Sequence, residues 1–488
     1  MPWLVLAALL VTCRALPYVV WGTLAFDADQ AVVGLMAKHV AEFRALPVYQ
    51  YGLPYVLMVT AYVTAPFMWV FGATPFALKL PLLLMNVGVG VATVMAIRAA
   101  GLRPAVALLL ALPVLVPSAV SGTGLMDALG MSIEPAVFVL ALWYGRRSPL
   151  VFGIVAAVGF HVREFVAYAV LAAVVVDVLS GNGLTRTAAR HWTRATMAAL
   201  GTTALIAGVA RFSSVRGPGT STALLVDGNL STLGAAFCFV PAQAWRNVID
   251  LGASYLGLLW GPVRAPLSDA AVQSTIWQGS DGAWPVFALA MLLAVGSIAW
   301  HWRALWTHRS SPVVRLGTFL ALVGAQSVIV YAISRCGELS VLTIRYALLG
   351  IFLPTGVALV AWVVSPGRIV RTTLGGAFVG LTILNLVPHA RLWAEQLRSP
   401  SMSNRAQLGA AMEARGLHYA RSDYWTAYYV AFLTHERVII GSDTLSRVDL
   451  YEHVLARHEA EVVRIATRPC DAAPPIVPGY YVCRQDGP

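Results

Sequence analysis

Two aspartates stand almost side by side near the start of the chain. Asp27 and Asp29 follow an apolar run over residues 3–24 and precede residues 31–43, whose apolar side chains recur at the spacing of an amphipathic helix lying on a membrane. An aspartate before a helix commonly caps its first amides, which stabilises the helix by about 1 kcal/mol. A carboxylate can also act as a general base that takes the proton of an attacking hydroxyl or amine. Spacing alone favours capping, although capping explains one aspartate more easily than two.

A third carboxylate, Asp127, lies in a predicted short loop between two apolar runs, and Glu134 follows shortly after it. Acidic side chains beside membrane spans are costly to bury and usually face a polar cavity. Asp127 could equally cap a helix, because residues 121–124 before it are small and mostly polar. The sequence leaves these two interpretations evenly weighted.

The composition places these carboxylates in a membrane protein. Of the 488 residues, 58% are hydrophobic and only 12% are charged, and the mean hydropathy is +0.71. A hydrocarbon core about 30 Å thick needs roughly 20 apolar residues per crossing helix. The alternating pattern of a membrane β-barrel is absent, so the spans are predicted to be helices. The apolar runs fall at about 3–24, 55–72, 76–97, 104–120, 131–145, 149–160, 165–179, 196–211, 284–300, 316–334, 343–364 and 370–388.

The net charge of +11 comes mostly from arginines in the loops between these runs, which indicates topology rather than nucleic-acid binding. Loops rich in arginine are usually cytoplasmic. If the run at 55–72 does not cross the membrane, all of these loops are cytoplasmic, and if it does cross, all of them are outside. We therefore predict an interfacial or re-entrant helix at 55–72 and about eleven spanning helices. The N-terminus is then cytoplasmic. The loop arginines are Arg98, Arg103, Arg146, Arg147, Arg186, Arg190, Arg194, Arg303, Arg309, Arg315, Arg368 and Arg371. The segments predicted to face outward are 25–75, 121–130, 161–164, 212–283, 335–342 and the C-terminal tail.

From about residue 389 the composition changes to frequent charges and broken apolar runs. Residues 389–488 are therefore predicted to form a small extracytoplasmic α/β domain. In that compartment a disulfide between Cys470 and Cys483 is allowed by redox conditions and by spacing. The predicted elements are a helix at 403–415, a strand near Arg437 to Ile440 and a helix at 447–460.

The densest aromatic stretch of the chain lies in this C-terminal part, at residues 419–429. Most of its rings are predicted to form the core of the small domain. Asp423 and Trp425 are the candidates for exposure, where an aromatic ring could stack on a sugar.

Three short strings near the N-terminus carry a family resemblance. They are Asp-Ala-Asp-Gln-Ala-Val-Val-Gly-Leu-Met-Ala at 27–37, Leu-Pro-Val-Tyr-Gln-Tyr-Gly at 46–52, and Phe-Gly at 71–72 followed by Phe-Ala-Leu-Lys at 76–79. They resemble the first loop of the GT-C membrane glycosyltransferases, especially the bacterial members related to protein O-mannosyltransferases and lipid A aminoarabinose transferases. The resemblance implies an all-α polytopic membrane domain over 1–388, with interfacial helices in the first extracytoplasmic loop at 25–75.

The resemblance also implies roles for individual residues. Asp29 matches the aspartate of an acidic pair that many members carry as Asp-Glu, with Gln30 at the glutamate position, and Asp27 is the alternative base. Arg345, followed by Tyr346, resembles an Arg-Tyr element and would contact the phosphate of the carrier lipid. Arginine suits this role because its planar donors bind phosphate oxygens two at a time. Snorkelling of the side chain to the membrane interface is the alternative for Arg345.

His161 and Arg163 join two short apolar runs on the predicted outer side. There they would line the donor pocket, because an anionic lipid phosphate needs cationic partners. An ion pair between Arg163 and Glu164 would explain the same charges without a ligand. The other pocket candidates are Asp127, Tyr346 and Tyr51.

Metal dependence is where the chain departs from the pattern of the family. Many relatives carry another acidic residue after the Tyr-Gly element, whereas this chain has no Asp or Glu between Glu42 and Asp127. We predict a metal-independent enzyme with no cofactor. If a divalent ion did bind, Asp27, Asp29 and Asp127 would supply oxygen ligands.

The sequence therefore predicts a multi-pass glycosyltransferase of the bacterial inner membrane. The donor would be a sugar on a polyprenyl phosphate, and the acceptor a glycan, lipid or protein on the periplasmic or external face; nucleic acid is not a predicted partner. A transporter or lipid flippase is the alternative, although transporters more often show paired repeats and broken helices at matching positions. A non-catalytic GT-C relative is the third possibility.

Overall fold

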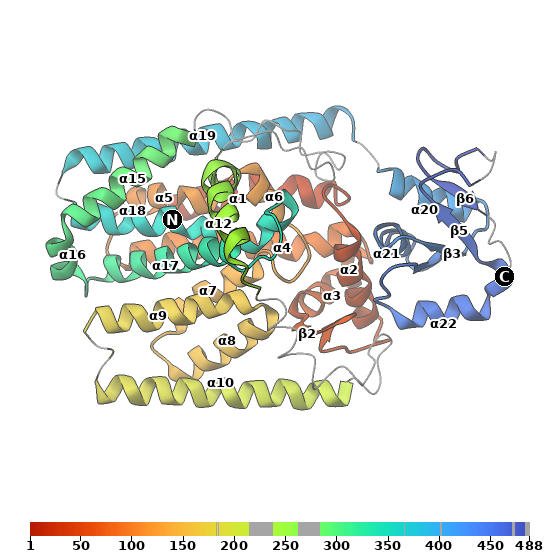
Figure 1. Ribbon diagram of the computed structural model, residues 1–488, viewed down its shortest axis with the longest axis horizontal. Coiled ribbons are helices and arrows are strands. Elements are labelled where there is room, and N and C mark those ends of the chain that lie inside the picture. The colour runs from red at the N-terminus through yellow and green to blue at the C-terminus, as the bar shows by residue number, and fades with distance from the viewer. Residues whose placement is uncertain are drawn as a thin grey trace.

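The computed structural model describes residues 1–181, 183, 185–213, 238–261, 284–365, 367–400, 403–470 and 474–483. Much of the predicted outward loop at 212–283 therefore lies outside the described residues. The described residues up to 400 form a bundle of helices running roughly side by side (Figure 1). Its elements are α1 (Pro2–Val20), α2 (Ala28–Ala41), β1 (Tyr49–Gln50), β2 (Leu53–Leu57), α3 (Val59–Phe71), α4 (Pro75–Ala99), α5 (Pro104–Leu115), α6 (Ala119–Gly124), α7 (Glu134–Gly145), α8 (Pro149–Val162), η1 (Glu164–Val166), α9 (Ala167–Leu179), α10 (Arg186–Ser213), α12 (Pro241–Asp250), η3 (Leu251–Tyr255), α13 (Leu256–Trp260), α15 (Trp284–Trp300), α16 (Trp302–His308), α17 (Pro312–Ile333), η4 (Val341–Ile351), α18 (Phe352–Val364) and α19 (Arg368–Arg398).

Residues 403–483 form a second part, here called the C-terminal unit, at one end of the bundle (Figure 1). Its sheet has the strand order β4-β3-β5-β6, in which β3 is parallel to β4 and β5 while β6 is antiparallel to β5. The helix predicted at 403–415 and the helix predicted at 447–460 are present as α20 and α22. The elements are α20 (Asn404–Ala414), β3 (Tyr419–Ser422), α21 (Tyr424–Leu433), β4 (Ile439–Ser442), α22 (Asp449–Arg457), η5 (Glu459–Glu461), β5 (Val463–Ala466) and β6 (Tyr481–Cys483).

Six helices in the described part of the chain are long and apolar enough to cross a membrane. They are α1, α4, α10, α17, α19 and the continuous stretch of η4 and α18. Counting α15 and α16, which meet at an angle of 77°, as one broken span gives seven. The other predicted spans coincide with the shorter helices α5, α7, α8 and α9. In the predicted span at 104–120, α5 stops at Leu115 just before Pro117, which cannot donate a helical hydrogen bond.

The run at 55–72, which decides the topology, forms the end of β2 and the whole of α3. Helix α3 has 13 residues, so it is about 20 Å long, shorter than the roughly 30 Å of the hydrocarbon core. It packs against α2 and α4. By its length alone α3 does not span the hydrocarbon core, and α5, α7 and α9 are no longer than α3.

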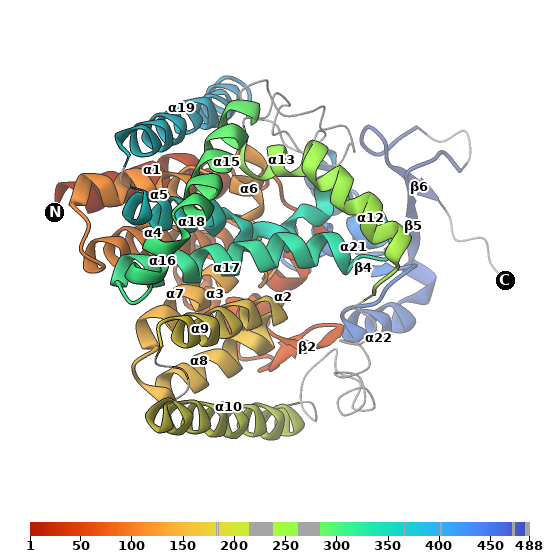
Figure 2. The same cartoon turned by 60° about the vertical axis from the view of Figure 1, so that its left-hand side comes forward.

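The loops rich in arginine lie together at one end of the bundle. The ends of α4, α9, α16 and α18 and the starts of α5, α10, α17 and α19 all lie opposite the C-terminal unit (Figures 1 and 2). We call this the arginine end. The other end, where α2 meets the C-terminal unit, is called the acidic end.

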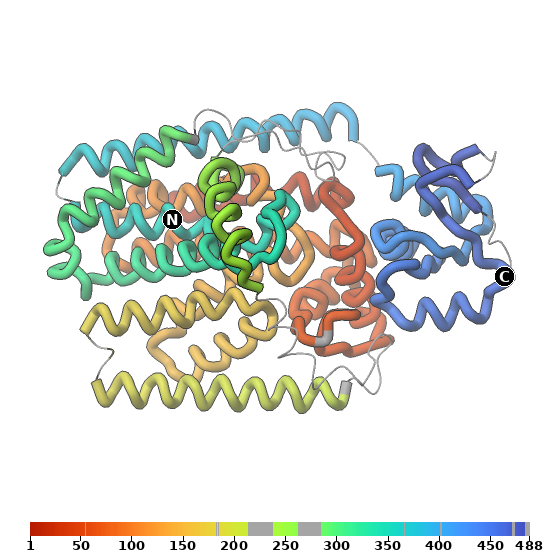
Figure 3. The backbone as a smooth tube through the Cα atoms, in the orientation of Figure 1, coloured from red at the N-terminus to blue at the C-terminus, as the bar shows by residue number. Residues whose placement is uncertain are grey.

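Helix α2 differs from the amphipathic surface helix predicted from the sequence. Every residue of α2 except Asp29 is buried, so that prediction is wrong. The reason is tertiary: α3 covers one side of α2 and α21 covers another, and the tube drawing shows α2 between the bundle and the C-terminal unit (Figure 3). A Cβ atom at Gly34 would lie 2.6 Å from Cε2 of Phe432 on α21. Glycine is therefore required where these two helices touch.

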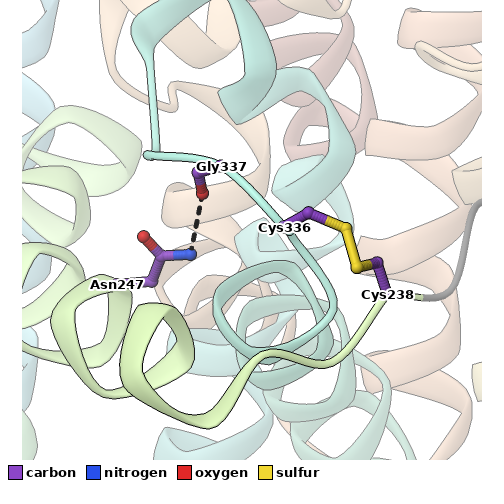
Figure 4. Close-up of a disulfide and its surroundings, with 4 residues drawn as sticks. All are labelled: Cys238, Asn247, Cys336 and Gly337. Atoms are coloured by element: carbon purple, nitrogen blue, oxygen red, sulfur yellow. Dashed lines mark hydrogen bonds between the residues drawn. A yellow bond between two sulfur atoms is a disulfide. The ribbon is translucent and has the colours of Figure 1, made fainter.

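Two disulfides are present in the described chain. Cys470 and Cys483 are joined, as their spacing allows, and Cys238 is joined to Cys336, a pairing that the sequence did not suggest. The second disulfide connects the residues before α12 to the loop between α17 and η4 (Figure 4). Asn247 on α12 donates a hydrogen bond from Nδ2 to the carbonyl oxygen of Gly337, at 3.2 Å. Both contacts fix the loop that leads into η4.

Candidate functional site

The two first-loop aspartates have separate tasks in the structure. Asp27 is the N-cap of α2, and its Oδ1 accepts a hydrogen bond from the backbone amide of Gln30 at 2.9 Å. Capping is therefore confirmed for Asp27. Asp29, in the first turn of α2, points to other elements: its Oδ1 accepts a hydrogen bond from the Tyr424 hydroxyl at 2.6 Å. Because Asp27 already caps the helix, Asp29 is free for another role.

Asp29 joins three elements that are far apart in the sequence. Tyr424 begins α21 of the C-terminal unit, and Arg345 lies on η4. Nη2 of Arg345 is 3.8 Å from Oδ2 of Asp29. Side-chain exposures of 26% for Arg345 and 21% for Asp29 leave both groups accessible from solvent. A carboxylate and a guanidinium thus face each other at the acidic end.

Gln30 ties the first loop to the loop that carries Asp127. Its Nε2 donates to the Ala25 carbonyl oxygen at 2.7 Å and to Oδ1 of Asp127 at 3.4 Å, while its Oε1 accepts from the amide of Ala128 at 3.2 Å. A glutamate here would place a carboxylate against the carboxylate of Asp127. The interpretation of Asp127 as a helix cap is wrong, because Ser118 caps α6 and Ile133 precedes α7.

A buried cation lies beneath the acidic loop. Lys79 on α4 is fully buried, and its Nζ donates to the carbonyl oxygens of Leu24 at 2.6 Å and of Ala25 at 3.4 Å. Ala25 has a φ of 49°, a conformation that few residues other than glycine adopt without strain. Sequence reasoning assigned no role to Lys79, although a single lysine within a predicted span is a signal for one.

Asp27, Asp127 and Arg345 line a cavity of about 560 Å³, while Asp29 contacts Arg345 without being one of the lining residues. This volume is within the roughly 300–1,000 Å³ range of pockets that hold small molecules. Asp27 and Asp127 line one wall and Arg345 another, while Arg405 and Trp425 reach the cavity from the C-terminal unit. Trp425 is 46% exposed, so its ring is open to a ligand. No sequence pattern indicates Arg405, because the distance between α20 and η4 depends on how the C-terminal unit packs against the bundle.

Burial and mutual repulsion make the cavity carboxyls hold protons unusually tightly. Burial, followed by the charge of Asp29, raises the pKa of Asp27 to about 6. Burial, followed by the charge of Asp27, raises the pKa of Asp127 to about 8. Asp127 is therefore mostly protonated near neutral pH and can donate a hydrogen bond into the cavity.

The protonation of Asp127 predicts a pH-dependent stability. An unfolded aspartate ionises near pH ~3.9, so between that pH and about 8 the folded protein holds a proton that the unfolded chain has lost. Stability must then fall as the pH rises through this window. We expect Asp127→Asn to be more stable than the wild type at pH 8 by on the order of 1 kcal/mol, and therefore to unfold at a higher temperature, with the difference shrinking towards pH 4. Tryptophan fluorescence during thermal unfolding in detergent measures this. Parallel pH profiles for the two proteins would contradict it.

Comparisons with known proteins bear on the fold. No protein-family model matches the sequence, and no curated protein matches it. Among solved structures, the apo crystal structure of the oligosaccharyltransferase of Archaeoglobus fulgidus is similar over 96% of this chain and 69% of that chain, with a TM-score of 0.50 and 10% identity. The chain has the GT-C glycosyltransferase fold. ArnT from Cupriavidus metallidurans, bound to undecaprenyl phosphate, aligns over 93% of this chain and 88% of its own, with a TM-score of 0.35 and 13% identity.

Several residues predicted for the pocket lie elsewhere in this GT-C fold. His161, at the end of α8, has its Nε2 3.4 Å from the Thr203 hydroxyl on α10. Arg163 is buried beyond the end of α8, and no ion pair with Glu164 occurs in the described structure. Neither His161 nor Arg163 is among the described residues that line the cavity. Tyr346 is not among the lining residues either, although the guanidinium carbon of Arg345 lies 5.6 Å from the centre of its ring.

Tyr51 belongs to the interface that holds the C-terminal unit on the GT-C fold. It is fully buried, with its hydroxyl 2.9 Å from Nδ1 of His39. His39 in turn meets the carboxylate of Glu436 at 2.9 Å, and that carboxylate also accepts from Lys38 Nζ at 2.6 Å and Arg44 Nη1 at 2.7 Å. Burial acts to raise the pKa of Glu436. Hydrogen bonds and charges of His39 and Lys38 outweigh it and hold the pKa of Glu436 well below its usual range. This cluster fixes α21, and with it Tyr424, against α2.

The acidic residues of the cavity do not make up a metal site. Within the described ranges, no three His, Cys, Asp or Glu side chains are placed to hold one ion. Asp27 is engaged as a helix cap and Asp29 by Tyr424. One carboxylate oxygen of Asp27 and one of Asp29 are therefore already used in hydrogen bonds within the protein.

Proposed function

We propose that this chain is a membrane glycosyltransferase that moves a sugar from a polyprenyl-phosphate donor to an acceptor on the extracytoplasmic face. The observation that carries the proposal is the meeting of Asp29 and Arg345, with 3.8 Å between Oδ2 and Nη2, beside the cavity at the acidic end. The carboxylate of Asp29 can take a proton from the acceptor, and the guanidinium of Arg345 can bind the phosphate that leaves. The family resemblance of residues 27–79 supports the same pairing.

The proposed reaction is a direct displacement at the anomeric carbon. A carboxylate oxygen of Asp29 takes the proton of the acceptor hydroxyl or amine, whose lone pair forms the new bond to the anomeric carbon. The bond from that carbon to the phosphate oxygen breaks, and its electrons leave with the polyprenyl phosphate. Arg345 stabilises the negative charge that develops on the leaving phosphate. Inversion at the anomeric carbon follows from the single displacement.

The contact between Tyr424 and Asp29 supports the role of Asp29 as the base. A hydroxyl group that donates to Oδ1 at 2.6 Å has the geometry that an acceptor hydroxyl needs. Burial and the charge of Asp29 raise the pKa of Tyr424, so this hydroxyl stays protonated and remains a donor. In our proposal the acceptor replaces Tyr424 at Asp29 when it binds.

The rest of the cavity suits a sugar attached to a lipid phosphate. Trp425 offers an exposed aromatic face for a sugar ring, and Arg405 is a second cation for the phosphate. On the η4 side, Val341, Leu342 and Leu348 supply apolar walls where the prenyl chain would enter from the bilayer.

The transporter alternative would need broken helices at matching positions around a central site. In the described chain one helix pair is sharply bent, α15 with α16 at 77°. Its bend is at the arginine end, away from α2 and the C-terminal unit (Figure 1). The bend therefore gives the transporter alternative little support.

Reconstitution of the purified protein in lipid vesicles tests the proposed function. A set of radiolabelled undecaprenyl-phosphate sugars would be offered together with a membrane extract as the source of acceptor. We expect release of undecaprenyl phosphate and label in a product that chloroform–methanol no longer extracts with the donor. Transfer from nucleotide sugars but from no lipid donor would contradict the donor class. Movement of intact donor across the vesicle membrane without loss of its sugar would favour a flippase, and no turnover with any donor would favour a non-catalytic relative.

A further inference from the structure

A second cavity lies at the arginine end, away from the proposed catalytic site. It has a volume of about 120 Å³ and is lined by the turn after α7 and by side chains of α7, α9, α10 and α17. The loop from α9 to α10 and the start of α17 reach the end of the bundle opposite the C-terminal unit (Figures 1 and 2). The cavity is smaller than the roughly 300–1,000 Å³ of small-molecule pockets. It therefore suits one compact polar group rather than a whole sugar or lipid.

Three guanidinium groups converge on this cavity. They belong to Arg146 and Arg147 after α7 and to Arg315 in the first turn of α17. Asp177 on α9 is the one carboxylate among the described lining residues, and its Oδ1 is 2.9 Å from Nη2 of Arg315. Nε of Arg315 is buried and has no hydrogen-bond partner within the described structure. The cavity is thus lined by three guanidinium groups and one carboxylate, and the buried Nε–H donor of Arg315 has no acceptor within the described structure.

Burial and the crowding of positive charge both act on Arg146. Burial, followed by the charges of Arg315 and Arg147, lowers the pKa of Arg146 to about 10. Its guanidinium carbon is 3.8 Å from the centre of the Trp143 ring, and Nη1 donates to the Trp143 carbonyl oxygen. A snorkelling arginine extends into water alone, whereas these side chains are gathered around one cavity. An anion placed there would relieve their repulsion.

We propose that this cavity binds the phosphate group of an anionic lipid in the leaflet at the arginine end. Phosphate accepts several charge-assisted hydrogen bonds at once, which matches converging arginines with an unused donor. Trp143 and Trp192 line the same cavity, and tryptophan is typical of the depth at which lipid head groups lie. Basic pockets between membrane helices on the cytoplasmic side commonly hold anionic head groups. The lipid would link α7, α9, α10 and α17, and this proposal does not depend on the enzymatic one.

Thermal unfolding of the full chain in detergent tests this proposal with three additives. The additives are phosphatidylglycerol, phosphatidylcholine, and sodium phosphate compared with sodium chloride at equal ionic strength. We expect phosphatidylglycerol to raise the unfolding temperature and phosphatidylcholine to leave it unchanged. A rise with sodium phosphate equal to that with phosphatidylglycerol would keep the phosphate site and identify free phosphate as its ligand. Equal rises with both lipids would overturn the proposal.

Arg147→Gln is the most informative variant, because Arg147 makes no hydrogen bond or ion pair within the part of the chain that the structure describes. Loss of one arginine contact near a membrane surface is worth about 1 kcal/mol, so the apparent affinity for phosphatidylglycerol should fall roughly five- to tenfold. Arg146→Gln serves as a second variant. Arg103→Gln, an exposed arginine on the same predicted side, is the matched control and should leave the affinity unchanged. The same affinity in Arg147→Gln, Arg146→Gln and the control would sink the idea.

Discussion

Asp29→Asn is expected to lower sugar transfer by about 10²- to 10⁴-fold, the usual contribution of a positioned general base. Asparagine has the shape of aspartate, and its amide oxygen can still accept the hydrogen bond that Tyr424 donates to Oδ1. The variant should therefore fold normally and lose only the ability to take a proton. The measurement is the initial rate of release of polyprenyl phosphate at saturating donor, with donor binding measured separately. Donor affinity should change little, because the loss is in the chemical step.

Two further variants give this experiment its controls. Asp27→Asn retains a good helix cap, since asparagine caps helices as well as aspartate does, so a modest loss of rate is expected. Tyr424→Phe removes the hydroxyl that occupies Oδ1 of Asp29 and tests whether Tyr424 competes with the acceptor. We expect a lower KM for the acceptor, with kcat little changed. A large loss in Asp27→Asn with full activity in Asp29→Asn would transfer the role of base to Asp27. Full activity in both asparagine variants would remove the catalytic proposal.

Arg345→Ala is expected to lower kcat by about 10²- to 10³-fold, as for loss of one group that stabilises charge in a transition state. It should also weaken donor binding, because the same guanidinium meets the phosphate in the ground state. Arg345→Lys retains the charge but not the planar pair of donors, so recovery should be only partial. Single-turnover rates, together with binding of undecaprenyl phosphate, separate the two effects.

Arg335 supplies a matched control for Arg345. Its guanidinium carbon lies 5.6 Å from the centre of the Tyr346 ring, the same distance as that of Arg345. Only Arg345 lines the cavity among these two residues. Arg335→Ala should therefore transfer sugar at nearly the wild-type rate. Equal losses in the two alanine variants would assign Arg345 to the membrane interface rather than to the donor.

The two disulfides differ in how well the sequence predicts their pairing. The predicted topology placed Cys238 and Cys336 in outward segments together with the C-terminal cysteines, so a bond between them was permitted. Nothing in their sequence separation of 98 residues suggested it. For Cys470 and Cys483, separated by 13 residues, spacing made the pairing visible. Pairing over long separations depends on which helices pack together.

Hydropathy and arginine placement determined the helical membrane fold and the common end of the arginine loops. Hydropathy reflects the free energy of transferring each residue between water and lipid. It can therefore be summed along a chain without knowledge of which residues contact one another. The motif resemblance likewise singled out Asp29 and Arg345 before any geometry. The sequence could not reveal that α2 is buried, because its polar residues resemble a solvated face until Glu436 and α21 cover them.

Asp27 and Asp29 show the same division most clearly. The sequence determined that two carboxylates begin a helix at a membrane boundary, and it left capping and catalysis as competing interpretations. In the tertiary structure Asp27 caps the helix, whereas Tyr424 and Arg345 contact Asp29, the residue that we propose as the base. A cap is a local interaction within three residues, whereas the partners of Asp29 come from helices whose relative positions are set by packing over the whole chain.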